Sequence, residues 1–123
     1  METYLLKRTL KEFHGTGAYH KHLFPGKSPI LLTDGCNFIR EECKAFWLFD
    51  AILSYQCEKI LSNLKFQIWE LQQSKKDLSW KLMCREDSGR KPIITQVIEF
   101  SDFPIPEIKI WVIDKVCLLP SEY

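Results

Sequence analysis

Two histidines separated by one residue, His20 and His22, are the side chains in this sequence whose spacing suits a shared metal ion. In an extended strand, residues two apart point to the same face, so both imidazoles could reach one ion. A metal site needs three or four ligands, and Asp34 or Cys36 could supply the others if the chain folds back over them. The alternative is that both rings face solvent or cap a sheet edge. We therefore expect no metal or other cofactor, and keep His20 and His22 as the candidate ligands.

Cys36 is the candidate nucleophile. It follows the turn Thr33-Asp34-Gly35 at the expected start of a helix, where the helix dipole lowers the pKa of a thiol. A neighbouring histidine, either His14, His20 or His22, would complete a thiolate–imidazole pair. The sequence specifies neither an oxyanion hole nor a group that orients the histidine. An inert cysteine at the turn is therefore the alternative.

Asp34 and Asp50 are the two carboxylates that merit attention. Asp34 fits a turn or helix N-cap residue. Asp50 lies between Phe49 and Ala51 in an apolar helical stretch, where a buried charge needs a partner. A buried aspartate with a raised pKa could act as a general acid–base, whereas an aspartate at the edge of the packed helix face would do no chemistry. The candidate catalytic residues are therefore Asp34, Cys36, His20, His22 and Asp50.

Helical elements and a small hairpin are expected to position these side chains. Apolar residues at spacings of three and four predict a short amphipathic helix over residues 3–13 and a long central helix over residues 45–61. Residues 37–43 fit one or two preceding helical turns. Between the two helices, residues 18–24 and 30–33 fit two short strands joined by the turn Pro25-Gly26-Lys27-Ser28.

After Asn63 the period of the apolar pattern changes from about 3.6 to 2, which indicates strands. Short connections between successive strands require antiparallel pairing. We therefore predict a single α+β domain over residues 1–123, in which an antiparallel four- to five-stranded meander is covered on one face by the long central helix and the short N-terminal helix, with the small hairpin at its side. The predicted strands are residues 64–71, 78–84, 93–100, 108–112 and 116–119.

Alternation along these strands divides the aromatic residues between the two sheet faces. Phe66 and Ile68 fall on one face of their strand, and Trp69 and Leu71 fall on the other. If the helices cover only one face, then Trp69, Leu71 and Trp111 would form an exposed apolar surface, which favours a homodimer through the sheet. One alternative is that the C-terminal strand or the N-terminal helix covers this face. Another is that the rings stack on single-stranded nucleic acid, which the lack of a basic groove disfavours.

Composition excludes several classes of partner. The formal net charge is +1 and charged residues make up 27%, so the sequence has no basic footprint for nucleic acid. No apolar run approaches the roughly 20 residues that span a bilayer, and the N-terminus does not resemble a signal peptide. The five cysteines include no C-x-x-C pair, which is typical of reduced thiols. We expect a cytoplasmic protein without a membrane or nucleic-acid partner.

Several separate blocks of sequence resemble a known family. They occur in one order along residues 10–123 as HGTGAYHKH, LLTDGCNFIREE, AFWLFDAILSYQ, FQIWEL, IEFSDFPIPEIKIWV and LLPSEY. Together they resemble a family of small bacterial proteins catalogued as a domain of unknown function. This chain has Ala18-Tyr19 where members of that family tend to have an aromatic pair. The resemblance implies one intact domain and no particular activity, ligand or partner.

Two hypotheses about function follow from the sequence. The first is a non-enzymatic cytoplasmic module that binds protein and forms a homo-oligomer, because the sheet is expected to be apolar on both faces and no complete catalytic set is present. The second is a small enzyme or metal-binding protein that uses His20, His22, Asp34 and Cys36. The second requires these side chains to converge in the folded chain.

Overall fold

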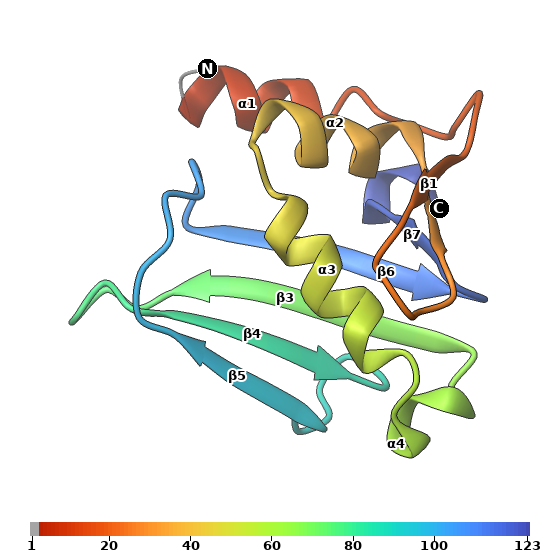
Figure 1. The fold of residues 1–123 in the computed structure, drawn as a ribbon. Coiled ribbons are helices and arrows are strands. Elements are labelled where there is room, and N and C mark those ends of the chain that lie inside the picture. Colours follow the sequence, from red (N-terminus) through yellow and green to blue (C-terminus); the bar gives the residue numbers. More distant parts are fainter. Residues whose placement is uncertain (1–2) are drawn as a thin grey trace.

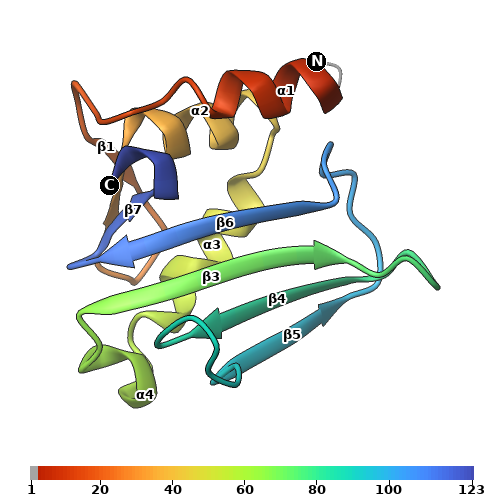
Figure 2. The same ribbon diagram turned by 180° about the vertical axis from the view of Figure 1, so that it is seen from behind.

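The chain folds into one continuous mixed sheet with helices on one of its faces (Figures 1 and 2). The computed structural model describes residues 3–123, with side chains from residue 5 onward; the first two residues of the N-terminus considered above lie outside it. Its elements are, in order, α1 (Thr3–Leu10), β1 (His20–His22), β2 (Ile30–Leu32), α2 (Asp34–Glu42), α3 (Phe46–Tyr55), α4 (Lys59–Ser62), β3 (Phe66–Gln73), β4 (Trp80–Arg85), β5 (Ile94–Ile98), β6 (Glu107–Ile113), β7 (Val116–Leu118) and the 3-10 helix η1 (Pro120–Glu122).

The α+β class and the small N-terminal hairpin are as predicted, but the sheet is larger than the predicted meander and is not wholly antiparallel. Among the described residues it has seven strands in the order β1-β2-β7-β6-β3-β4-β5. Strand β6 pairs with β3 on the side opposite β4, and β2 pairs with β7 in parallel. That parallel junction rests on few bonds, including Leu31 N–H to Lys115 C=O at 2.9 Å and Thr33 N–H to Cys117 C=O at 3.0 Å. Strands of three residues carry too little pattern to predict such a junction.

The predicted long central helix is interrupted. Helix α2 ends before Cys43, and Lys44 adopts a φ of 52°, which lies in the left-handed region. A right-handed helix cannot continue through that conformation, so the chain turns before α3 begins at Phe46. Helix α3 then ends at Tyr55, and the short α4 follows only from Lys59.

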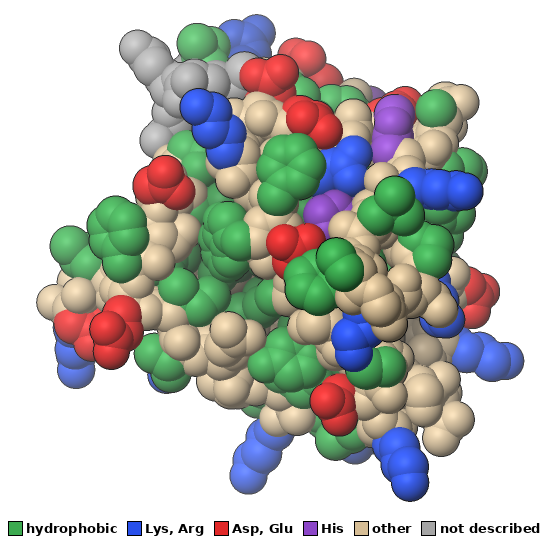
Figure 3. Space-filling view, in the orientation of Figure 1, with side chains coloured by type: hydrophobic (Ala, Val, Ile, Leu, Met, Phe, Trp, Pro, Cys, Tyr) green, Lys and Arg blue, Asp and Glu red, His purple; other side chains and the backbone are tan. Residues whose placement is uncertain are grey.

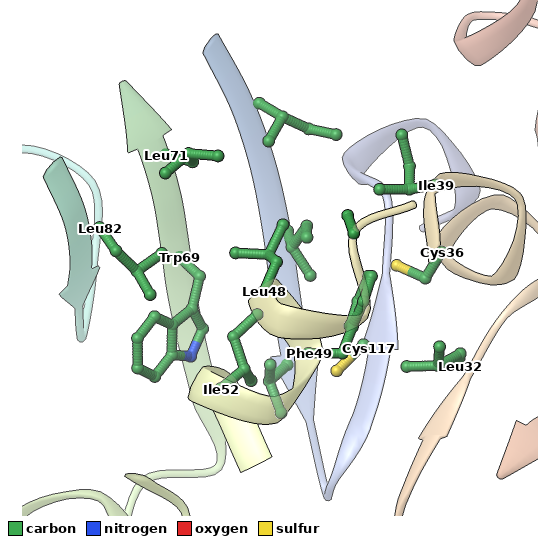
Figure 4. Packing of buried hydrophobic residues seen from close by; sticks show 14 of the residues in the cluster. Leu32, Cys36, Ile39, Leu48, Phe49, Ile52, Trp69, Leu71, Leu82 and Cys117 are labelled. Atoms are coloured by element: carbon green, nitrogen blue, oxygen red, sulfur yellow. The ribbon is translucent and has the colours of Figure 1, made fainter. Parts of the chain in front are cut away.

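Helix α3 supplies the core side chains that face the sheet. Leu48, Phe49 and Ile52 are buried; Leu48 and Ile52 lie on the side of β3 and β6, and Phe49 lies beside Cys117 of β7 (Figure 4). Across from them lie Trp69 and Leu71 of β3, each 1% exposed. The helix spacing and the strand alternation therefore meet in one core, as the period change in the sequence predicts.

The prediction that Trp69 and Leu71 lie on the uncovered face is wrong. Alternation correctly separates them from Phe66 and Ile68, but it is the side of Trp69 that the helices cover. Alternation alone does not say which face is covered, and the covered face also carries a polar residue, Gln67, which is 3% exposed.

Gln67 is tolerated inside because both the nitrogen and the oxygen of its amide have hydrogen-bond partners. Its Nε2 donates to Gln56 Oε1 and its Oε1 accepts from Gln56 Nε2, both at 2.9 Å. The same Oε1 accepts the indole N–H of Trp69 at 2.8 Å. A buried amide with partners on both its nitrogen and its oxygen avoids the cost of an unmade hydrogen bond.

Among the described residues, no α-helix packs over the opposite face of the sheet (Figure 2). Phe66 and Trp111 lie on that face, half-buried. Within the described chain, no helix is long and apolar enough to cross a membrane.

Replacing Gln67 by leucine tests this amide pair. Gln67→Leu preserves the approximate size but leaves the indole N–H of Trp69 without an acceptor, and should lower the free energy of unfolding by about 1–3 kcal/mol. Urea denaturation followed by tryptophan fluorescence measures it. Gln72→Leu, on the outer face of the same strand, is the control and should change stability by less than about 0.5 kcal/mol. Equal effects of the two substitutions would contradict the prediction.

Candidate functional site

Histidine side chains gather with acidic and basic side chains on the helix-covered face of the molecule (Figure 3). Strand β1 lies at the edge of the sheet beside α2, so the histidine strand and the turn before α2 come together. His20 Nε2 lies 2.9 Å from Asp34 Oδ1. This is the convergence that the second hypothesis required for that pair.

Asp34 is held by a small polar network. Its Oδ2 accepts the Gly17 N–H at 2.9 Å, and its own N–H donates to Thr16 Oγ1 at 2.8 Å. The hydrogen bond from His20, followed by that from Gly17, lowers the pKa of the Asp34 carboxyl below its ordinary value of 3.8. The ionised carboxylate therefore orients the His20 ring, which is one-third exposed.

His22 makes a different pair. Its Nε2 lies 2.7 Å from Asp50 Oδ1, and its Nδ1 lies 3.1 Å from Arg40 Nη1. A guanidinium group can only donate, so Nδ1 must be an acceptor and Nε2 must carry the proton. His22 is therefore a neutral imidazole with both nitrogens engaged. It has no lone pair left for a metal ion or for a substrate proton.

Arg40 explains why His22 is fixed in this way. Besides contacting His22, Arg40 donates to the Lys21 carbonyl at 3.0 Å and to Asn37 Oδ1 at 2.8 Å. Its guanidinium also lies 5.4 Å from the centre of the Phe46 ring. Arg40 thus joins β1 to α2 and to the start of α3. The hydrogen bonds from His22 to Asp50 and to Arg40 therefore hold the edge strand β1 against α2 and α3.

The two histidines are consequently not a shared ligand pair. His20 pairs with the start of α2, and His22 pairs with the middle of α3. Among the described residues, no group of three or more His, Cys, Asp or Glu side chains could hold a metal ion. Asp50 proves to be a helix-flank residue, because its side chain is 40% exposed.

Cys36 does not have the environment expected of a nucleophile. It is buried in the core near Cys117 (Figure 4), and burial raises the pKa of its thiol well above the ordinary value, with Cys117 and Glu122 adding to the effect. The expectation that the helix dipole would lower its pKa is therefore wrong. The helix end is already occupied: the hydroxyl of Thr33, which is the N-cap, accepts the Cys36 N–H at 3.4 Å.

Glu122 is the residue of this region that the sequence did not single out. Its Oε1 accepts from the Thr33 hydroxyl at 2.6 Å and from the Leu119 N–H at 2.9 Å, and its Oε2 accepts the Gly35 N–H at 3.0 Å. The signal was the SEY ending, which the resemblance included but which no periodicity explains. A carboxyl at a helix N-terminus is favoured by the helix dipole.

The same contact explains Gly35. A Cβ at this position would lie 2.5 Å from Glu122 Oε1 and 2.7 Å from Leu119 Cδ1. Glycine is thus required by close approach of the C-terminal segment and not by its backbone angles. In the turn Thr33-Asp34-Gly35, Thr33 and Gly35 contact Glu122, and Asp34 contacts His20.

Removal of the Glu122 carboxyl should be costly. Glu122→Ala leaves the Gly35 N–H and the Thr33 hydroxyl buried without an acceptor, and we expect a loss of about 2–4 kcal/mol in the free energy of unfolding. Chemical denaturation followed by circular dichroism measures it. Ser121→Ala, at the exposed neighbouring position, is the control and should be close to wild type. A loss below about 1 kcal/mol in Glu122→Ala would mean that water replaces the carboxyl.

The lowered pKa of Asp34 has a consequence for stability at acid pH. A carboxyl whose pKa is lower in the folded state stabilises the fold above its unfolded pKa, and this contribution is lost as the pH falls through the folded pKa. Wild type should therefore exceed Asp34→Asn in free energy of unfolding at neutral pH, and the difference should shrink below the ordinary value of 3.8. Denaturation from pH 7 to pH 2.5 measures this. Asp87→Asn, which removes another exposed carboxylate, is the control substitution, and the same pH dependence in both variants would contradict a specific role of Asp34.

Comparison with known proteins agrees with the resemblance seen in the sequence. No curated protein and no solved structure matches the chain. Residues 4–123, nearly the whole chain, match a family described as one of unknown function. The chain therefore belongs to the family of unknown function DUF6876.

Proposed function

We propose that this chain is a protein-binding module that pairs with a second copy through the uncovered face of its sheet. The observation that carries the proposal is a row of aromatic rings on that face. The rings of Phe66 and Trp111 lie 5.2 Å apart, and those of Trp111 and Tyr123 lie 5.5 Å apart. Tyr123 is 82% exposed. Aromatic side chains supply much of the energy of protein interfaces.

Aliphatic residues extend this row into an apolar patch. Strand alternation places Ile68 and Ile113 on the same outer face, with Leu118 of β7 opposite Trp111. Ile113 is half-buried, whereas Ile68 and Leu118 are 7% and 8% exposed, so the rings and Ile113 provide most of the accessible apolar surface. Phe66 pairs with Ile113 across β3 and β6. The patch thus spans three neighbouring strands, which is the form of surface that packs against another sheet.

Charge favours a second copy as the occupant. The aromatic row itself contains no charged side chain. On the same face Glu70 pairs with Arg85, with Arg85 Nε 3.2 Å from Glu70 Oε1, and Lys109 lies two residues before Trp111. A formal net charge of +1 produces little repulsion between copies. A two-fold dimer needs one self-complementary patch, and a neutral apolar surface meets that requirement.

The proposed interface differs in composition from the one expected from sequence. Trp111 keeps its place, whereas Trp69 and Leu71 are core residues and Phe66 and Tyr123 take over their role. We place the module in the cytoplasm, because its five cysteines are free thiols, three of them buried, which suits a reducing compartment.

The small-enzyme hypothesis has less support. Cys36 is buried with a raised thiol pKa, and both nitrogens of His22 are engaged. What remains is the His20–Asp34 pair, an oriented imidazole with no described nucleophile beside it. An orienting pair alone does not make a catalytic set.

The dimer is tested by light scattering coupled to size exclusion over a dilution series. Wild type should pass from dimer to monomer with dilution, and Tyr123→Glu should raise the dissociation constant by about tenfold or more, because a charge enters the apolar interface. Phe100→Glu is the matched control: Phe100 is 84% exposed and follows β5, the edge strand that β3 and β4 separate from β6. Its dissociation constant should equal that of wild type. A wild type that stays monomeric at every concentration, or equal effects of both substitutions, would refute the proposal.

A further inference from the structure

A second feature of the fold has the properties of a binding groove. A cavity of about 430 Å³ lies between α1, the first half of β6 and η1. None of the candidate residues His20, His22, Asp34, Cys36 or Asp50 lines it. Its volume lies in the range of sites that bind ligands.

The cavity occupies the place of a missing strand. Strand β7 pairs with β6 only at Trp111, Val112 and Ile113. The described chain places no strand beside residues 107–110 on that side of β6. After Leu118 the chain turns through Leu119 and Pro120 into η1, so β7 stops where the cavity begins. Figures 1 and 2 both show α1, and no strand, next to this half of β6.

An exposed strand edge offers backbone groups for pairing. A strand whose neighbour ends early presents unpaired N–H and C=O groups, and an extended peptide can add to them. Along β6 the pattern is alternating, with Ile108 and Ile110 buried and Lys109 exposed. A peptide strand beside it would therefore meet an apolar surface with every second side chain.

The inner lining of the cavity is apolar. It is formed by Leu10 of α1, Ile105 and Ile108 before and within β6, and Leu119 before η1. These side chains come from three separate parts of the sequence. They form a floor that could accept the aliphatic side chains of a bound strand.

The rim of the cavity is basic. Lys7 lies on α1, Lys11 follows directly after the last residue of that helix, and Lys109 lies across the cavity on β6. In the part of the chain that the structure describes, none of these three forms an ion pair. Glu107 is the one acidic residue of the lining, so positive charge is in excess. Acidic side chains of a ligand would find partners on both sides.

We infer that this groove binds an extended acidic segment of a partner protein, which adds as a strand to the free edge of β6. Its side chains alternate between aliphatic residues, directed to the floor formed by Leu10, Ile105, Ile108 and Leu119, and acidic residues, directed to Lys7, Lys11 and Lys109. This surface shares no residue with the aromatic row of the proposed dimer and adjoins it at Lys109, two residues before Trp111 on β6.

Fluorescence anisotropy with a labelled hexapeptide of alternating glutamate and valine tests the inference. We expect saturable binding that weakens as salt is raised, and none for the peptide with lysine in place of glutamate. The double variant Lys7→Glu/Lys11→Glu should raise the dissociation constant by about tenfold or more, because two attractive contacts become repulsive. Lys75→Glu/Lys76→Glu, in the exposed turn between β3 and β4, makes the same change of charge elsewhere and should leave binding unchanged.

Two further measurements separate strand addition from simpler modes of binding. The same peptide N-methylated at alternate residues keeps its charge but loses backbone donors, and should bind about tenfold or more weakly. Two results would overturn the inference in favour of a site for small amphipathic anions. One is that the methylated peptide binds as tightly as the unmethylated one; the other is that decanoate alone displaces the unmethylated peptide. Tyr123→Glu should bind the peptide as wild type does, so failure of the dimer proposal and failure of this one remain distinguishable.

Discussion

The carboxyl of Glu122 is the contact on which the arrangement of this fold depends. It accepts hydrogen bonds from the Thr33 hydroxyl, the Gly35 N–H and the Leu119 N–H, and so joins the C-terminal segment to the first turn of α2. The parallel pairing of β2 with β7 runs directly up to this contact, since Thr33 N–H donates to the Cys117 carbonyl. A buried carboxyl is costly unless its oxygens are satisfied, and here the donors of a helix end satisfy it. The N-terminal hairpin and the C-terminal strand are thereby held as one half of the sheet, to which β6 joins the β3–β5 meander.

The local patterns of this chain were predictable where one element repeats its pattern over enough residues. Periodicity alone predicts the helix around Leu48 and Ile52. It also predicts that Trp80 and Leu82 share the buried face of their strand. The covered face of β3 cannot be predicted in this way, because alternation separates two faces without saying which one is buried. Gln67, a polar residue, lies on the covered face, and its hydrogen bonds with Gln56, the C-cap residue of α3, offset the cost of burying its amide. The break at Lys44 was hidden for a similar reason: a left-handed lysine has no mark in the sequence comparable to a glycine or a proline.

The candidate site shows the same division. The sequence predicted that His20 and Asp34 would meet if the hairpin folded back over the turn, and in the structure they are hydrogen-bonded. The sequence did not predict that both ring nitrogens of His22 are hydrogen-bonded. One of these contacts comes from Arg40, eighteen residues away, which looks like an ordinary surface cation in the sequence. Cys36 illustrates a third case. Its position at a helix start suggested a thiolate, but burial opposes the charged form of the thiol and outweighs the helix dipole, which already interacts with Glu122.

One turn of the chain connects the contact at Glu122 with the open edge of β6. For Glu122 to reach Gly35, the chain must leave the sheet directly after Leu118, and Leu119 and Pro120 make that turn. A longer β7 would cover residues 107–110 of β6 but would carry Glu122 away from the start of α2. Proline at the first position of η1 also lacks the N–H with which a further strand residue would pair. The stability gained at the start of α2 and the unpaired edge beside α1 are therefore two results of the same backbone geometry. The segment after Leu118 could cover the groove only as a longer β7. Three hydrogen bonds to the Glu122 carboxyl hold that segment at the start of α2 instead, so the edge of β6 stays unpaired.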